Sequence, residues 1–170
     1  RNFKVTDKGG TAIGYGRSIW AMIDTNSRQP TDILAVQDGL IMDYVEKEIP
    51  CPIKKASRVP INIEDTKPVR TIDTYYNDID INGHVNSIKY IEHILALWDL
   101  DWYKKYQLKR YEIAYVAESH QGDKLRFYLE DISEGNNNNE KNFNILITKT
   151  SSKESKEVEV VRSYVKFVKD

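Results

Sequence analysis

Apolar and polar residues alternate along residues 11–23, and a period of two predicts a strand with one buried face. The apolar positions of one parity are Ile13, Tyr15, Ile19, Ala21 and Ile23. Lys8-Gly9-Gly10 supplies a turn signal just before this strand, and apolar residues at positions 3 and 5 begin a partner strand. Residues 3–23 are therefore expected to form a hairpin.

Apolar residues then recur at helical spacing along residues 32–48, which predicts a modest helix. Two strands and one helix do not close a hydrophobic core, so we interpret residues 1–49 as the trailing part of a domain and expect the chain to be a fragment. Residues 50–68 hold four of the five prolines. Proline lacks an amide donor and restricts the residue before it, so this segment is expected to be an extended connector.

A more complete pattern follows the connector. Residues 69–76 are rich in β-branched and aromatic side chains and predict a strand, and residues 87–99 carry a helical apolar stripe. The stripe consists of Ile88, Ile91, Ile94, Leu95 and Trp98, which are expected to face the core. Four further strand-like runs lie at 109–118, 123–131, 142–150 and 157–168. This order predicts an α+β unit in which an antiparallel sheet wraps one long helix.

Composition narrows the classes of function. The chain has 170 residues, with 25 Lys and Arg against 26 Asp and Glu. A protein that neutralises phosphates needs a basic excess, so nucleic acid is not an expected partner. The longest apolar run, 94–98, is far shorter than the roughly 20 residues of a membrane span. The single cysteine, Cys51, excludes an internal disulfide and fits a reducing compartment such as the cytoplasm.

The loop before the helix has an unusual density of polar residues. Asp78, Asp80, Asn82 and Gly83 match positions 1, 3, 5 and 6 of a calcium-binding EF-hand loop. Position 12 would be Lys89, where such a loop requires a bidentate Glu, and the segment before the loop is strand-like where an EF-hand has a helix. Calcium is therefore disfavoured, and neither a metal nor an organic cofactor is expected.

Alternation offers a second interpretation of the same loop. In extended backbone, Asp80, Asn82 and His84 point to one side, so that an acid, an amide and an imidazole converge where a helix begins. The amide hydrogens at a helix N-terminus suit a developing oxyanion. Alternatively, Asp80 and Asn82 form Asx turns and cap the helix, with His84 as a neighbour. Spacing alone does not choose between these interpretations.

The segment Asp80-x-Asn82-x-His84-Val85-Asn86-x-x-Lys89-Tyr90-Ile91 resembles the motif of the acyl-[acyl-carrier-protein] (acyl-ACP) thioesterases, also called oleoyl-ACP hydrolases. The family's second signature is a glutamate in a strand after the helix, and Glu118 falls there. Residues 14–24 also resemble the end of the family's first domain, so the resemblance covers nearly the whole chain. It implies two tandem hot-dog domains, each a long helix wrapped by an antiparallel sheet.

The implied organisation is a trailing part of the N-terminal hot-dog domain at 1–49, a Pro-rich connector at 50–68 and the C-terminal hot-dog domain at 69–170. Two departures from the family pattern are expected: the sequence lacks the front of the first domain, and Ser119 stands where many relatives carry cysteine. Cys51 lies in the connector and cannot replace that cysteine.

The resemblance implies hydrolysis of fatty acyl-ACP thioesters, with Asp80, Asn82, His84 and Glu118 as catalytic residues. We favour attack by water, activated by Glu118 and His84, over attack by Ser119, because a serine hydroxyl needs a well-placed base. Asp80 would orient His84 or the water, and Asn82 with the helix-start amides would hold the oxyanion. The roles of Asp80 and Glu118 are interchangeable at this point.

The expected partner is an acyl carrier protein, and the C-terminal domain would pair with the first hot-dog domain or, in a homodimer, with a second copy. Two alternatives stay open. One is a non-catalytic hot-dog module that binds acyl thioesters, and the other is a hydratase-like hot-dog enzyme that leaves the thioester intact. Acyl chain length is not predicted by the sequence.

Overall fold

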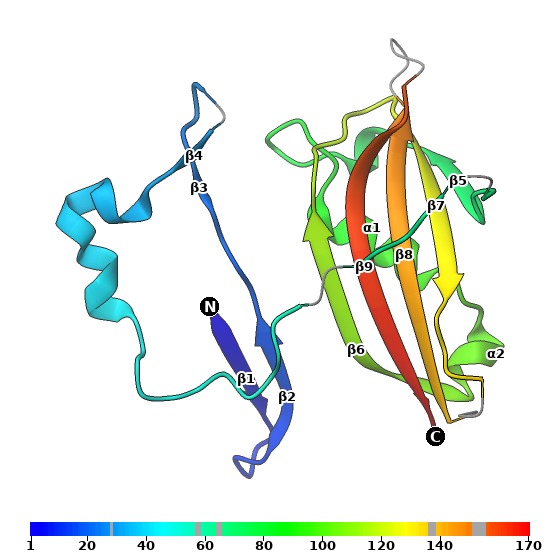
Figure 1. Cartoon of the computed structure of the whole chain (residues 1–170), viewed down its shortest axis with the longest axis horizontal. Coiled ribbons are helices and arrows are strands. Elements are labelled where there is room, and N and C mark those ends of the chain that lie inside the picture. Colours follow the sequence, from blue (N-terminus) through cyan, green and yellow to red (C-terminus); the bar gives the residue numbers. More distant parts are fainter. Residues whose placement is uncertain (28, 57–58, 64–65, 136–138, 151–155) are drawn as a thin grey trace. The chain divides into compact units, whose positions relative to one another are not determined.

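The computed structural model describes residues 1–27, 29–56, 59–63, 66–135, 139–150 and 156–170. The chain divides into two compact units, Arg1–Lys55 and Ala56–Asp170 (Figure 1). Two short parts of the expected connector, 57–58 and 64–65, lie outside the described residues.

Two short hairpins form the strands of the first unit. β1 (Asn2–Thr6) pairs antiparallel with β2 (Ala12–Arg17), and β3 (Met22–Ile23) pairs with β4 (Pro30–Thr31). The predicted hairpin is thus confirmed as far as Arg17, where β2 ends.

The predicted buried face of this hairpin is wrong. Ile13, Tyr15 and Ile19 are 67%, 46% and 84% exposed. No described residue of the first unit is buried, because short two-stranded ribbons need a second layer before their apolar side chains leave water. The alternation specifies a face without specifying what covers it.

The helix predicted at 32–48 is a 3₁₀ helix, η1 (Ile33–Tyr44), and it is interrupted. Asp32 caps its start by accepting a hydrogen bond from the Leu34 N–H. Positive φ angles at Gln37, Asp38 and Gly39 then break the helical path. None of its residues is buried, so the segment lacks the tertiary packing that stabilises most α-helices in proteins.

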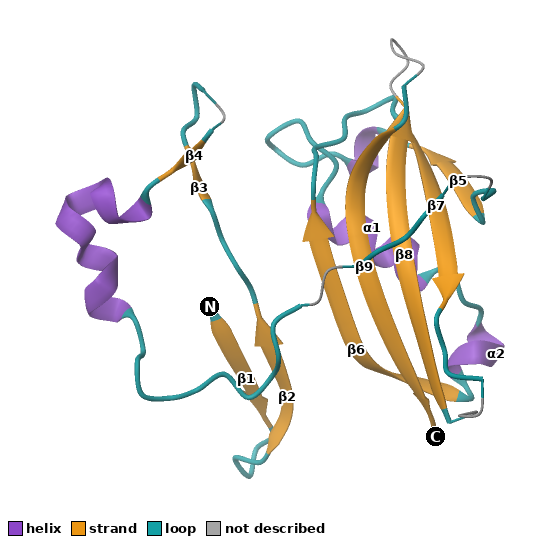
Figure 2. Cartoon of the chain, viewed as in Figure 1, coloured by secondary structure: helices purple, strands orange, loops and turns teal. Residues whose placement is uncertain are grey.

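Five antiparallel strands form the sheet of the second unit in the order β5-β7-β8-β9-β6 (Figure 2). Their bounds are β5 (Arg70–Asp73), β6 (Tyr106–Tyr115), β7 (Lys124–Asp131), β8 (Glu140–Thr150) and β9 (Val158–Lys169). Strands β6 to β9 confirm the four predicted strand-like runs. β5 is shorter than predicted, because a 3₁₀ turn, η2 (Tyr76–Asp78), follows it and Asp78 accepts the Tyr75 N–H.

One α-helix, α1 (Ser87–Leu95), packs on one face of this sheet (Figure 1). Its core-facing residues are Tyr90 and Ile94, which are 3% and 0% exposed. The predicted core-facing stripe is therefore partly wrong, because Ile88 is 54% exposed. The helix also ends before Trp98, and Asp99 caps a second helix, α2 (Leu100–Tyr103), by accepting the Trp102 N–H.

The core lies between α1 and the sheet, where Ile94 contacts a cluster of strand residues that includes Phe127, Ile145 and Phe167. Trp98 closes one end of this cluster, with its ring centroid 4.8 Å from that of Phe167. The packing of α1 against a five-stranded antiparallel sheet confirms the predicted α+β class.

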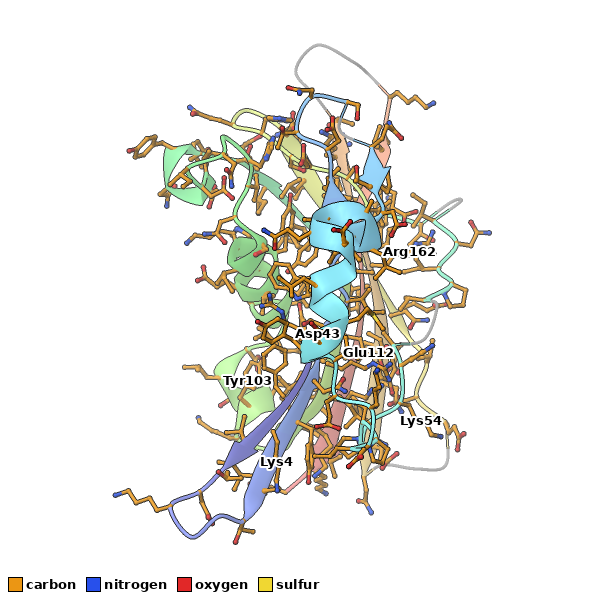
Figure 3. The ribbon with its side chains drawn as sticks, turned by 90° about the vertical axis from the view of Figure 1, so that its left-hand side faces the viewer. Lys4, Asp43, Lys54, Tyr103, Glu112 and Arg162 are labelled. Atoms are coloured by element: carbon orange, nitrogen blue, oxygen red, sulfur yellow. The ribbon has the colours of Figure 1, made fainter. Side chains whose placement is uncertain are left out.

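The described connector residues near Val59 belong to the second unit. Arg162 of β9, labelled in Figure 3, donates to the Val59 carbonyl, and Asn144 of β8 donates to the Pro60 carbonyl at 3.2 Å. Val59 is buried. These contacts attach the connector to the sheet through two polar side chains.

Candidate active site

The loop between η2 and α1 is a tight hairpin turn. Ile79 pairs with Val85, the Asp80 N–H donates to the His84 carbonyl at 2.8 Å, and the Gly83 N–H donates to the Asp80 carbonyl at 3.0 Å. Gly83 has a φ of +81°, which glycine adopts at little steric cost. The expectation of extended backbone here is wrong, because Asn82-Gly83 favours a three-residue turn with a left-handed residue.

The Asp80 carboxylate stabilises this turn from inside. It accepts the Asn82 N–H at 2.8 Å and the His84 N–H at 3.3 Å. The hydrogen bond from the Asn82 backbone is the largest cause that holds the pKa of Asp80 below its ordinary value. The Asn82 side chain lowers that pKa further.

The start of α1 is capped by Asn86. Its side-chain oxygen accepts the Ile88 N–H at 3.0 Å. Asp80 therefore forms an Asx turn, as the alternative with Asx turns and a helix cap predicted. The residue that caps the helix is Asn86, however, and not Asp80 or Asn82. The turn delivers His84 two residues before the helix N-cap.

His84 meets Glu118 across 34 positions of sequence. Its Nε2 atom lies 3.2 Å from Glu118 Oε2, which is hydrogen-bonding distance. The two side chains are 25% and 48% exposed, so the pair is open to solvent. Glu118 follows β6 instead of lying in the strand, which corrects its predicted position. An imidazole beside a carboxylate at an accessible edge can move a proton to or from water.

A backbone hydrogen bond joins the two segments that carry this pair. The Val85 N–H donates to the Ser119 carbonyl at 2.8 Å, one residue beyond each partner. The fold thus brings His84 and Glu118 together directly. Asp80 contacts His84 through the backbone, and Asn82 stays on the exposed turn.

Ser119, the residue after Glu118, has no exposed surface. Its Oγ atom and the Tyr90 hydroxyl are both buried, and neither has a hydrogen-bond partner of good geometry within the described ranges. Burial raises the pKa of Tyr90 to about 12, and the nearby Ser119 hydroxyl opposes this rise. A side chain enclosed in this way is poorly placed to attack a substrate that arrives from solvent.

Sequence reasoning missed several groups around the site. The exposed His120 ring lies edge-on to His84, with centroids 5.0 Å apart. Lys149 Nζ donates to the Glu118 carbonyl at 2.6 Å and lies 3.3 Å from Asp123 Oδ2. The Gln121-Gly122-Asp123 turn was the available signal for Asp123. Nothing in the local pattern around Lys149 marks a residue that reaches this turn from β8.

The described residues contain neither a metal-binding cluster nor a membrane-spanning helix. No group of three or more His, Cys, Asp and Glu side chains is arranged to hold a metal ion in that part of the chain. Among the helices formed by the described residues, none has the length and apolar character to cross a membrane.

Comparison with protein families matches residues 61–164 to the C-terminal domain of acyl-ACP thioesterases. An acyl-ACP thioesterase from Bacteroides thetaiotaomicron is 47% identical over 98% of this chain and 61% of its own, with a TM-score of 0.80. An oleoyl thioesterase from Lactobacillus plantarum is 20% identical over 99% of this chain and 62% of its own, with a TM-score of 0.74. Comparison with curated proteins gave no match.

A hexameric hot-dog thioesterase of Campylobacter jejuni shares the fold at 13% identity, over 61% of this chain and 83% of its own, with a TM-score of 0.52. This similarity confirms the predicted hot-dog fold. The chain spans about three fifths of the length of the two larger relatives.

Proposed function

Because the chain belongs to the acyl-ACP thioesterase family, we propose that it takes part in hydrolysing fatty acyl-ACP thioesters to free fatty acid and carrier protein. The observation that carries the proposal is the His84 Nε2 to Glu118 Oε2 contact of 3.2 Å at a solvent-accessible edge. His84 and Glu118 also stand at the two positions by which the sequence resembles the motif of this family.

In the proposed reaction, water attacks the thioester carbonyl carbon while Glu118, with His84, accepts its proton. The carbonyl electrons move to oxygen and then return, the C–S bond breaks, and the thiolate of the carrier takes the proton. The products are a fatty acid and a free thiol, so no oxidant or cofactor enters the balance.

Asp80 and Asn82 have supporting roles in the proposal. The Asp80 carboxylate accepts the His84 N–H at 3.3 Å, which supports a role in orienting His84 through the backbone. Asn82 is exposed and is the proposed oxyanion donor, with the amides at the start of α1 as further candidates. Asn82→Ala should lower kcat by about 10²–10³-fold if its amide faces the oxyanion.

The proposed partner is an acyl carrier protein in the cytoplasm, and the proposed assembly pairs the second unit with a first hot-dog domain or with a second copy of the chain. A non-catalytic acyl-thioester-binding module and a hydratase-like enzyme are the competing functions. Release of free thiol from acyl-ACP separates hydrolysis from both, and a change in enoyl absorbance identifies a hydratase.

The test is thiol release from acyl-ACPs of graded chain length, measured on the longest natural chain that contains this sequence. Glu118→Gln should lower kcat by about 10²–10⁴-fold, the usual range for loss of a general base. The matched control is Glu92→Gln, because Glu92 is an exposed glutamate on α1 that pairs with Lys89. Wild-type turnover in Glu118→Gln would contradict the proposed base.

Substitution of Ser119 distinguishes attack on the thioester by water from attack by the serine hydroxyl. Ser119→Ala should keep activity within about tenfold of wild type, a change of about 1.4 kcal/mol in barrier. Rapid quenching with acyl-ACP should give no acyl-enzyme by mass spectrometry. An acyl group trapped on Ser119, with loss of turnover in the alanine variant, would refute water attack and leave thioester hydrolysis standing.

A further inference from the structure

The segment from Glu118 to Asp123 has no regular secondary structure, yet its backbone is held from several sides. Thr74 Oγ1 donates to the His120 carbonyl at 2.7 Å, and the His120 N–H donates to Asp123 Oδ2 at 3.0 Å. On the other side of Ser119, the Glu118 carbonyl accepts Lys149 Nζ at 2.6 Å. These contacts fix the peptide groups on both sides of Ser119, and one of them holds the carbonyl of Glu118, the proposed base.

An ion pair between the half-buried Lys149 and the buried Asp123 contributes to this arrangement. Lys149 Nζ lies 3.3 Å from Asp123 Oδ2, and the two side chains are 18% and 8% exposed. Removing two charges from water is unfavourable, and well-packed apolar residues often stabilise a fold equally well. The β8 backbone pairs with β7 and β9 at position 149 whatever its side chain. The pairing of β8 with its two neighbours therefore does not require a lysine at this position.

Lys149 contacts both ends of the 118–123 segment. One Nζ atom contacts the Glu118 carbonyl and the Asp123 carboxylate, and the same Asp123 oxygen holds the His120 N–H. A displacement of Nζ would therefore remove a contact from the Glu118 carbonyl, which belongs to the backbone that carries the Glu118 side chain. A shift of the carboxylate by about 1 Å would take it out of hydrogen-bonding distance of His84.

We propose that Lys149 is a positioning residue that aims the Glu118 carboxylate at His84, with Asp123 as its buried counter-charge. This inference rests on the proposed function, in which Glu118 is the base. Lys149 itself contacts no reacting atom. It acts by holding the Glu118 carbonyl from the strand β8.

The chain offers a matched control. Lys166 of β9 pairs with Glu140 at 2.8 Å, with side chains 27% and 38% exposed. This is also a lysine–carboxylate pair on the same sheet, but its contacts do not reach the 118–123 segment. Lys166→Met removes a comparable ion pair and should leave kcat within about twofold of wild type.

The direct test is a crystal structure of Lys149→Met, which keeps most of the apolar stem and removes the charge. The separation of His84 Nε2 and Glu118 Oε2 should increase beyond the 3.2 Å of the native protein. An unchanged separation overturns the inference. This measurement does not depend on activity, so it also distinguishes the failure of the inference from the failure of the proposed function.

The kinetic test is a double-mutant cycle between Lys149 and Glu118. Lys149→Met alone should lower kcat by about 10²-fold, the scale of a 1 Å misplacement, with little change in KM. In the Glu118→Gln background the same change should have no further effect. An equal loss in both backgrounds would mean a structural role and would overturn the inference. If the wild-type protein released no thiol from acyl-ACP, the proposed function itself would be refuted.

A second variant covers the case in which Lys149→Met unfolds because Asp123 is left buried without its cation. Lys149→Met/Asp123→Asn removes both charges and keeps a side-chain oxygen for the His120 N–H. It should fold, as judged by its melting temperature, and should show the same loss of kcat and the same longer His84–Glu118 separation. Full activity in this folded variant overturns the inference.

Discussion

Two turns, one in each unit, follow the same structural pattern. In Asp7–Thr11 the Asp7 N–H donates to the Thr11 carbonyl at 2.9 Å, and in Asp80–His84 the Asp80 N–H donates to the His84 carbonyl at 2.8 Å. Both aspartates accept the N–H groups of the residues two and four positions later. The fourth residue is a glycine with a φ of +84° in the first turn and +81° in the second.

This similarity separates the structural part of the motif from the chemical part. The aspartate and the glycine have equivalent roles in a turn that has no neighbouring acid–base pair in its described surroundings and in a turn that carries one. The difference is the last residue, Thr11 against His84, together with the environment. In the second unit, Ile79 and Val85 on either side of the turn belong to the core or pack against it, and Glu118 lies beside His84, whereas no described residue of the first unit is buried.

Exchanging the last residues of the two turns should give the largest effect. His84→Thr gives the second turn the residue found in the first, and kcat for thioester hydrolysis should fall by about 10²–10⁴-fold because the imidazole is lost. Thr11→His is the matched control and should leave kcat unchanged, since an imidazole there has no Glu118 counterpart in its own unit. Turnover that survives in His84→Thr would show that the turn contributes structure alone.

Deleting an apolar side chain from each unit tests the difference in environment. Ile94→Ala should lower the free energy of unfolding by about 2–5 kcal/mol, because Ile94 is fully buried against the sheet. Ile13→Ala should change it by less than about 0.5 kcal/mol, since Ile13 is 67% exposed. Urea denaturation measures both. A loss of similar size for Ile13 would mean that its side chain is covered in solution.

The sequence was sufficient to predict the strands β6 to β9, because period-two alternation and turn residues are local signals. The orientation of α1 was predicted less well. Tyr90 lies outside the predicted stripe, yet with Ile94 it forms the buried face, which turns Ile88 toward solvent. A helical pattern in which a tyrosine and several isoleucines compete does not fix which side faces the sheet.

For the candidate site, His84 and Glu118 could be proposed from the motif, but their 3.2 Å contact depends on how β6 ends beside the turn. Lys149 could not be predicted, because it lies 26 residues from Asp123 and their pairing depends on strand register. The apolar alternation in the first unit predicted a buried face that the described unit does not cover. Contacts between distant segments were the information that local patterns lacked.

Adding a β-carbon to each turn glycine should have an intermediate effect. Neither Gly10 nor Gly83 has an atom within 4 Å of the position that a β-carbon would occupy, so the strain comes from the positive φ alone. Gly83→Ala should destabilise its turn by about 1–2 kcal/mol, which should appear as lower stability and lower kcat. Gly10→Ala introduces the same strain in a unit with no buried residue among those described, and it should leave kcat unchanged. Equal activity losses in the two variants would contradict this difference.

The smallest expected effect concerns the charge of Asp80. Asp80→Asn keeps a side-chain oxygen that can accept the Asn82 and His84 N–H groups, so kcat at neutral pH should stay within about tenfold of wild type. Asp80→Ala removes that acceptor and should lower activity further. A large loss in a well-folded Asp80→Asn variant would instead assign the carboxylate to the chemistry, as an acid or base exchangeable with Glu118.

The pH dependence of stability provides an independent check on the same residue. Because the turn amides hold the pKa of Asp80 below its ordinary value of 3.8, the unfolded chain binds a proton at this site more readily than the folded one. The contribution of the charged turn to stability is therefore present above pH 3.8 and is lost as pH falls through the lower folded-state pKa. Acid unfolding of Asp80→Asn should lack this component, so its stability should change less steeply than that of wild type below pH 3.8. Identical acid profiles would show that the hydrogen bonds in the turn do not depend on the charge.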